Sequence, residues 1–174
     1  GSAAQIPGVV ELTDLGALTA DIVSAFRSAI ESAGILLRMR CDPTLPPVPV
    51  DRDMWETIVS NLLSNALKFT FSGVIAVELR GRALHAELIV RDTGIGIPSG
   101  EMRNLFKRFH RIPGARGRTA EGSGIGLSLV HDLLSRMGGQ IRALSQPGTG
   151  TSFTVWIPYK SPRSAAPTEP ASGA

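Results

Sequence analysis

Hydrophobic side chains recur at helical spacing in two stretches of the chain, and the sequence predicts three long helices in all. The first is expected to begin at a cap on Thr13 or Asp14 and to end near Ala33, before Gly34. The other two are expected from a cap at Asp51 to about Phe69 and from about Ile125 to Met137. In the second helix the apolar stripe predicted to face the sheet is Trp55, Ile58, Val59, Leu62, Ala66 and Phe69.

Short apolar or alternating runs between these helices predict strands. The predicted strands are Val9–Leu12, Ile35–Cys41, Val74–Arg80, Ala83–Arg91, Gln140–Leu144 and Thr151–Pro158. A rigid proline-rich loop is expected over Pro43–Pro49, and a short helix around Gly100–Phe106. Hairpins mixed with helices favour an α+β fold, a two-layer sandwich with helices on one face of a mixed, mostly antiparallel sheet.

Composition narrows the class of protein. A chain of 174 residues with 43% hydrophobic side chains suits one domain, expected over residues 9–160. Residues 1–8 are expected to be an expression scar and linker, and residues 161–174 a disordered tail or linker. The net charge is only +3, and the basic residues are not interleaved with aromatics, so no nucleic-acid partner is expected.

Two further observations concern the cellular setting. No apolar run approaches the roughly 18 residues of a membrane span, so no membrane contact is expected for this chain. Cys41 is the single cysteine, which excludes an internal disulfide and favours a reducing, cytoplasmic location.

The predicted helix 51–69 carries a polar face. Asn61, Asn65 and Lys68 stand at helical spacing and therefore share one side. Amide oxygens can bind Mg²⁺ without cancelling the charge of a phosphate, and a lysine can meet phosphate directly. The alternative interpretation is an ordinary solvated helix face.

Asp92 follows a predicted strand and begins the segment Asp92–Ile97, which reads Asp-Thr-Gly-Ile-Gly-Ile. An ionised carboxylate only accepts hydrogen bonds, so it favours a donor such as the exocyclic amine of adenine. Gly94 and Gly96 would let the backbone approach a flat ligand. The alternative is an Asx-turn in a tight loop.

A second glycine cluster, Gly122–Leu127, opens the third helix, where backbone N–H groups favour anions such as phosphates. The alternative is a flexible hinge. Neither cluster has the context of a Rossmann fingerprint, and no P-loop pattern is present.

Between the glycine clusters lies an aromatic and basic segment. Phe106 and Phe109 are expected to anchor it by burying their rings, so that Lys107, Arg108 and Arg111 reach a triphosphate. The alternative is a short amphipathic helix followed by a solvated basic loop.

These segments together resemble the catalytic and ATP-binding domain of sensor histidine kinases, in the GHKL ATPase superfamily, over roughly Val9 to Tyr159. Asn61–Lys68 resembles the N box of that family, Asp92–Ile97 its G1 box, and Leu105–Phe109 its F box. Gly122–Leu127 resembles the G2 box, and Gly148–Phe153 a further Gly-Thr-Gly-Thr segment.

The resemblance implies ATP and Mg²⁺ as cofactors. Asn65 would be the main Mg²⁺ ligand, with Asn61 assisting, and Lys68 would contact phosphate. Asp92 would accept from the adenine amine, and Arg108 would approach the γ-phosphate. The further nucleotide-binding residues that the resemblance implies are Phe69, Gly94, Gly96, Ile97, Phe109, Arg111, Gly122, Gly124, Ile125, Gly126, Leu127 and Thr151.

One position indicates the reaction class. Hydrolytic members of the superfamily carry a general-base Glu four residues before the Mg²⁺ Asn, whereas here that position is Asn61, which cannot take up a proton. The resemblance therefore implies that ATP is held for transfer of its γ-phosphate to a protein group.

The acceptor implied by the family is a histidine on a preceding helical hairpin, followed by relay to an Asp on a response regulator receiver domain. None of His85, His110 and His131 has the surrounding sequence of that acceptor, so the hairpin is expected upstream of this chain. The chain itself is expected to be monomeric, because the hairpin carries dimerisation in the family. Two alternatives stay open, a serine kinase of anti-sigma-factor type and a non-catalytic ATP-binding regulatory module.

Overall fold

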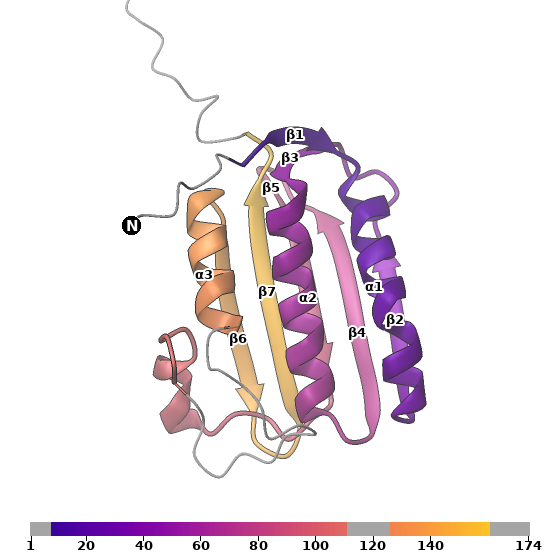
Figure 1. Cartoon of the computed structure of the whole chain (residues 1–174), viewed down its shortest axis with the longest axis vertical. Coiled ribbons are helices and arrows are strands. Elements are labelled where there is room, and N and C mark those ends of the chain that lie inside the picture. The colour runs from indigo at the N-terminus through magenta and orange to yellow at the C-terminus, as the bar shows by residue number, and fades with distance from the viewer. Residues whose placement is uncertain (1–7, 111–125, 161–174) are drawn as a thin grey trace, which may run out of the picture.

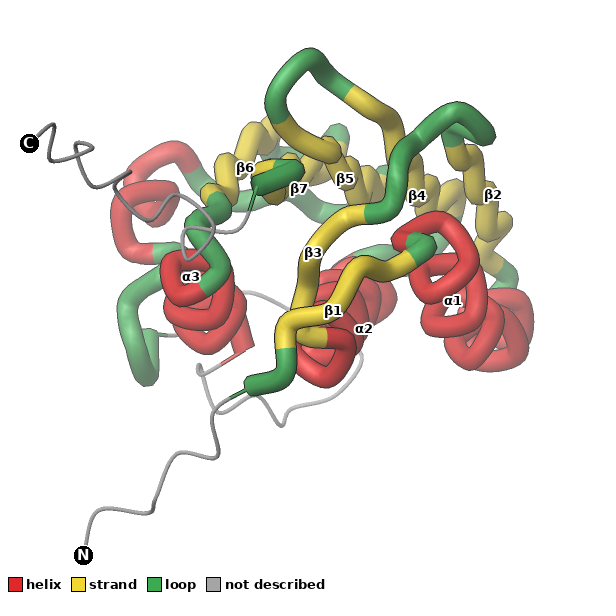
Figure 2. Tube along the Cα trace, turned by 90° about the horizontal axis from the view of Figure 1, so that it is seen from above, coloured by secondary structure: helices red, strands yellow, loops and turns green. Residues whose placement is uncertain are grey.

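The computed structural model describes residues 8–110 and 126–160, and these form two layers (Figure 1). The elements in chain order are β1 (Val10–Thr13), α1 (Leu15–Ser32), β2 (Ile35–Cys41), β3 (Val48–Asp51), α2 (Arg52–Phe69), β4 (Gly73–Gly81), β5 (His85–Asp92), the 3-10 helix η1 (Ser99–Asn104), α3 (Gly126–Arg136), β6 (Gln140–Gln146) and β7 (Gly150–Pro158). Seen from above, α1, α2 and α3 lie on the same face of the main sheet (Figure 2).

The main sheet has the strand order β2-β4-β5-β7-β6. Only β2 and β4 pair in parallel, and the other neighbours are antiparallel. The predicted fold class, helices on one face of a mixed and mostly antiparallel sheet, is therefore confirmed.

Aspartates begin the first two helices, as the sequence predicts. The Asp14 Oδ1 atom accepts a hydrogen bond from the Ala17 N–H at 3.0 Å, and Asp51 Oδ1 accepts one from the Met54 N–H at 3.1 Å. These caps satisfy N–H groups that have no partner within the helix. They fix where α1 and α2 start, and so which residues of each helix face the sheet.

The core lies between the helices and the sheet, and α2 provides much of it. Its residues Trp55, Ile58, Val59, Leu62 and Ala66 are buried, as predicted. Phe69, the last member of the predicted stripe, is only half-buried, because it lies at the end of the helix beside a pocket. The Trp55 Nε1–H donates to Thr19 Oγ1 at 2.9 Å, which ties α2 to α1.

The structure differs from the prediction at β3, which falls partly in the expected proline-rich loop. Val48 and Val50 are buried while Pro49 between them is half-buried, so the short segment alternates like a strand. Within its sheet β3 pairs with β1 alone. A proline is tolerated there because an edge strand does not need every N–H for pairing.

Two smaller differences concern element ends. The expected helix around Gly100–Phe106 is a 3-10 helix that ends at Asn104. The expected strand from Ala83 begins instead at His85, and Leu84 is exposed. Residues 1–7 of the predicted linker 1–8 and the whole predicted tail 161–174 lie outside the described residues, as do residues 111–125.

Candidate functional site

A pocket of about 400 Å³, partly open to solvent, lies where α2 and β5 end and where α3 and β7 begin. Its lining residues are Asn65, Phe69, Asp92, Ile95, Gly96, Ile97, Leu105, Leu127 and Thr151. Most of them were predicted site residues, although they come from segments far apart in the sequence. Ile95 and Leu105 were not predicted individually as site residues. The sequence signal that could have identified them is that they belong to the motifs Asp92–Ile97 and Leu105–Phe109.

Asp92 is the last residue of β5, and its side chain is 7% exposed. Its Oδ1 atom accepts hydrogen bonds from the Gly94 N–H at 2.9 Å and the Thr151 N–H at 3.3 Å. Burial raises the pKa of the Asp92 carboxyl, and these two hydrogen bonds oppose the rise. Within the described part of the chain both hydrogen bonds go to Oδ1, which leaves Oδ2 to accept from a ligand.

The Asx-turn that was the alternative interpretation of Asp92 is present, since the bond from Gly94 to Asp92 Oδ1 forms it. The turn and a ligand contact are compatible, because the turn occupies one carboxylate oxygen. It holds the other oxygen at a fixed position on the pocket wall.

Backbone contacts hold the segment Asp92–Ile97 in place. The Ile95 N–H donates to the Phe69 carbonyl at 3.1 Å, and the Gly148 N–H donates to the Ile95 carbonyl at 2.8 Å. A Cβ on Gly94 would lie 2.4 Å from the Phe69 carbonyl oxygen, and one on Gly96 would lie 2.3 Å from that of Gln146. Glycine is therefore required at both positions, and Gly96 also has a positive φ of +74°.

The polar face of α2 lies beside the start of α3. The Asn61 Nδ2–H donates to the Thr57 carbonyl at 2.7 Å, so the Asn61 amide oxygen points away from its own helix. That oxygen lies 3.0 Å from where a Cβ of Gly126 would be. Asn65 lines the pocket, whereas Lys68 places its Nζ 5.2 Å from the centroid of the Phe69 ring.

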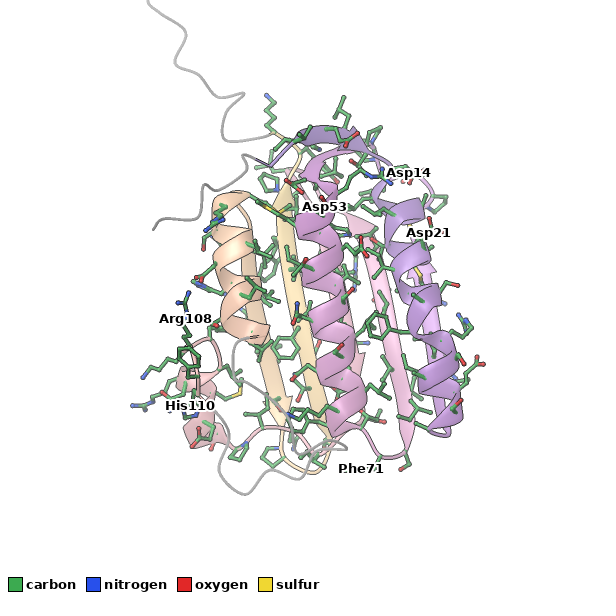
Figure 3. All side chains as sticks on the ribbon, viewed as in Figure 1. Asp14, Asp21, Asp53, Phe71, Arg108 and His110 are labelled. Carbon is green, nitrogen blue, oxygen red and sulfur yellow. The ribbon has the colours of Figure 1, made fainter. Side chains whose placement is uncertain are left out.

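Arg108 does not line the pocket. It is 66% exposed, and its Nη2 atom lies 3.6 Å from Asp132 Oδ2 on α3. Phe106 is half-buried, with its ring centroid 5.7 Å from that of His131. Figure 3 shows Arg108 and His110 at the edge of the molecule, near the start of α3. The segment that contains Phe106 and Arg108 thus contacts α3 through the exposed residues His131 and Asp132.

The expectation that Phe109 buries its ring is wrong, because Phe109 is 67% exposed and has a φ of +64°. A positive φ is a backbone conformation that bulky residues rarely adopt. The backbone of the segment, which a motif does not specify, decides where the ring points.

Several predicted residues lie outside the described residues, namely Arg111, Gly122, Gly124 and Ile125. Among those described, His85 packs edge-on against Trp156, with ring centroids 6.2 Å apart, and is not in the pocket. Across 8–110 and 126–160, no group of three or more His, Cys, Asp or Glu side chains is placed to hold a metal ion. In the same ranges no helix is long and apolar enough to cross a membrane.

Residues 50–161 match the family described as histidine kinase-, DNA gyrase B- and HSP90-like ATPases. The sensor histidine kinase RcsC of Escherichia coli (strain K12) is 42% identical over 117 residues, which are 65% of this chain and 12% of RcsC. The sensor-like histidine kinase SenX3 of Mycolicibacterium smegmatis is 34% identical over 157 residues, 89% of this chain and 41% of SenX3. The chain thus spans less than half the length of these relatives.

Solved structures show the same fold. Full-length ShkA in complex with AMPPNP has a TM-score of 0.79 and 24% identity, covering 91% of this chain and 33% of ShkA. The mycobacterial sensor histidine kinase MprB has a TM-score of 0.72 and 28% identity, covering 88% of this chain and 99% of the MprB chain.

Proposed function

We infer the function of this chain from one premise: it belongs to the family of histidine kinase-, DNA gyrase B- and HSP90-like ATPases, as a catalytic domain of the sensor histidine kinase type. We propose that it binds ATP in the pocket at the end of α2 and presents the γ-phosphate to a histidine on a helical hairpin of the same protein. The phosphoryl group then passes to an Asp on a response regulator receiver domain.

The geometry of Asp92 is the observation that carries the proposal. Its Oδ1 atom is occupied by backbone donors, and its Oδ2 atom is left to accept from the amino group of adenine. Around it, Phe69, Ile95, Ile97, Leu105 and Leu127 supply apolar surface for the ring. Gly94 and Gly96 keep the wall free of side chains.

Mg²⁺ fits the donors on α2. Asn65 lines the pocket, and the Asn61 amide oxygen is oriented outward by the hydrogen bond of its amide nitrogen to Thr57. Neutral amide oxygens suit an ion that takes most of its ligands from phosphates and water. Bound there, Mg²⁺ would neutralise phosphate charge. Lys68 and, beyond the described residues, Gly122, Gly124 and Ile125 are proposed to meet the phosphates.

Transfer rather than hydrolysis is proposed because Asn61 occupies the position of the general base in hydrolytic members of the superfamily. Positioning and charge neutralisation then carry the reaction, as is usual in phosphoryl transfer. Arg108, Arg111 and Phe109 are proposed to act at the phosphate end. Arg108 would first have to leave Asp132, because it does not line the pocket here.

Calorimetric titration with ATP, with and without Mg²⁺ and with GTP as the control, tests the proposal. We expect binding that selects adenine and tightens with Mg²⁺. Absence of ATP binding would contradict the proposed site. Binding without phosphotransfer, when the acceptor hairpin is supplied, would favour a non-catalytic regulatory module, and transfer to a partner serine would favour an anti-sigma-factor type of kinase.

A further inference from the structure

Ser145 lies beneath the pocket and was not among the predicted site residues. It is half-buried on β6, directly opposite Thr151 on β7 in the register of the two strands. Its Oγ atom accepts a hydrogen bond from the Ile97 N–H at 2.7 Å. It also lies 3.0 Å from the Gly150 carbonyl oxygen and 2.9 Å from Thr151 Oγ1. One hydroxyl thus joins the loop after β5 to the β6–β7 hairpin.

The number of protons decides the direction of these bonds. A serine hydroxyl has one proton and two lone pairs. The Ile97 N–H occupies one lone pair, and the Gly150 carbonyl can only accept, so the Ser145 proton goes to Gly150. The hydrogen bond between Ser145 and Thr151 is then satisfied only if Thr151 donates its proton to Ser145.

Thr151 therefore has no proton left for a ligand, so its Oγ1 atom can only accept a hydrogen bond from a ligand in the pocket that Thr151 lines. Asp92, which also lines the pocket, accepts through Oδ2 when ionised. Two acceptors favour a 6-amino purine, whose amino group carries two N–H donors, directly or through water. They disfavour a 6-oxo purine, because its N1–H can meet only one of the two acceptors and its oxygen needs a donor.

We propose that Ser145 is a positioning residue that holds Thr151 as an acceptor and thereby contributes to the selection of adenine over 6-oxo purines. The inference rests on the proposed function, since it concerns the base end of the same nucleotide pocket. Removal of the Ser145 hydroxyl frees the Thr151 proton, which can then be donated to the oxygen of a 6-oxo purine.

The test compares the Kd of ATP with that of ITP, which has the 6-oxo group without the extra 2-amino group of GTP. Both are measured by competition calorimetry for the unmodified chain, Ser145→Ala, Thr151→Val and the double variant. We expect Ser145→Ala to lower the preference for ATP about tenfold, the usual effect of one hydrogen bond. In the Thr151→Val background the same change is expected to alter the preference less than about twofold, because no hydroxyl remains to donate.

Controls separate this effect from a displaced loop. Ser145→Thr keeps the hydroxyl and is expected to keep the preference, whereas a general loss of packing would weaken both nucleotides equally. If Ser145→Ala changed the preference equally in both backgrounds, or left it unchanged, the inference would be overturned. Equal binding of ATP and ITP by the unmodified chain would also overturn the inference, whereas failure to bind ATP at all would contradict the proposed function itself.

Discussion

The two ends of the candidate site are built differently. At the base end, Asp92 and Thr151 are buried, and the backbone and Ser145 hold them through short hydrogen bonds. At the phosphate end, Lys68 rests on the Phe69 ring, and Arg108 pairs with Asp132 while mostly exposed. The base end is held in place because Asp92 and Thr151 lie at the ends of strands β5 and β7. The phosphate end depends on the long side chains of Lys68 and Arg108.

This difference indicates that the two ends have different proposed roles, recognition of the base at one end and phosphoryl transfer at the other. The base end already has the arrangement that the proposed recognition of adenine needs, and it retains that arrangement at a cost, since burial disfavours the charge of Asp92. The phosphate end has its charges in weak surface contacts that cost little to break. The groups proposed to recognise the base are therefore already in place, whereas the groups proposed for transfer have to be repositioned.

Removal of the Arg108 side chain should show the difference between the two ends most strongly, because it should affect phosphotransfer far more than ATP affinity. If Arg108 stabilises charge at the γ-phosphate during transfer, Arg108→Ala is expected to slow phosphotransfer on the order of a thousandfold, as for other arginines in that role. ATP affinity should change less than about threefold, because Arg108 lies outside the pocket lining. Radiolabel transfer to the supplied acceptor hairpin and calorimetry measure the two effects. An equal loss in both would make Arg108 a binding residue.

At the base end, Gly94→Ala should have the next largest effect. The new Cβ would lie 2.4 Å from the Phe69 carbonyl oxygen and 2.9 Å from Asp92 Oδ1, so the loop must move. We expect ATP affinity to fall about a hundredfold and the free energy of unfolding to fall by about 1–3 kcal/mol, the usual cost of overpacking. Calorimetry and urea unfolding measure these changes.

Gly100→Ala is the matched control for that experiment. A Cβ on Gly100, in η1, meets no atom within 4 Å. Both ATP affinity and the free energy of unfolding should stay close to those of the unmodified chain. Normal ATP binding by Gly94→Ala would show that the base end is less rigid than its contacts indicate.

The structure brings most of the residues predicted for the base end to one pocket, and this grouping depends on local signals in the sequence. Asp51 as a cap and the apolar stripe of α2 fix the helix that carries Asn65, and the glycines of Asp92–Ile97 mark a tight loop. The contact between Ser145 and Thr151 was missed because it depends on the register of two strands. Such a contact leaves no pattern in one sequence.

Predictions at the phosphate end were less successful for a related reason. Phe109 was expected to anchor the segment by burying its ring, but the ring is exposed and the residue has a positive φ. The ion pair between Arg108 and Asp132 joins two segments whose relative placement cannot be read from any local pattern in the sequence.

Away from the site, strand β3 was missed because Pro49 interrupts the alternation of Val48 and Val50.

Asp92→Asn changes the base end with the smallest change in shape. The amide oxygen can still accept from Gly94 and Thr151, but the amide nitrogen would present donors to the donor amine of adenine. We expect ATP affinity to fall by about 1.5–3 kcal/mol, the value of a hydrogen bond to a charged group. Calorimetry tests this, and an unchanged affinity would remove Asp92 from the adenine site.

The same substitution should affect the stability of the nucleotide-free chain in the opposite direction. Because the folded pKa of Asp92 is raised above its ordinary value of 3.8, the folded state binds more protons just above that pH, and the free energy of unfolding falls as pH rises through this window. The Asp92→Asn variant has no carboxyl group to ionise at this position, so its free energy of unfolding does not fall for this reason. It should be relatively more stable at pH 7, with an advantage that shrinks below pH 3.8. Urea unfolding at several pH values measures this, and an advantage that grew on acidification would reverse the sign of the pKa shift.

The smallest expected effect concerns the pair that holds Arg108 away from the pocket. An exposed ion pair with a 3.6 Å separation contributes about 0–1 kcal/mol, so Asp132→Asn should leave the free energy of unfolding nearly unchanged. It should speed phosphotransfer by no more than about threefold, since Arg108 then leaves α3 at lower cost, and added salt should remove the gain. Asp21→Asn, an equal charge change at an exposed position on α1, is the control (Figure 3). Slower transfer in Asp132→Asn alone would mean that Asp132 guides Arg108 toward the phosphates, and the phosphate end would then be as preformed as the base end.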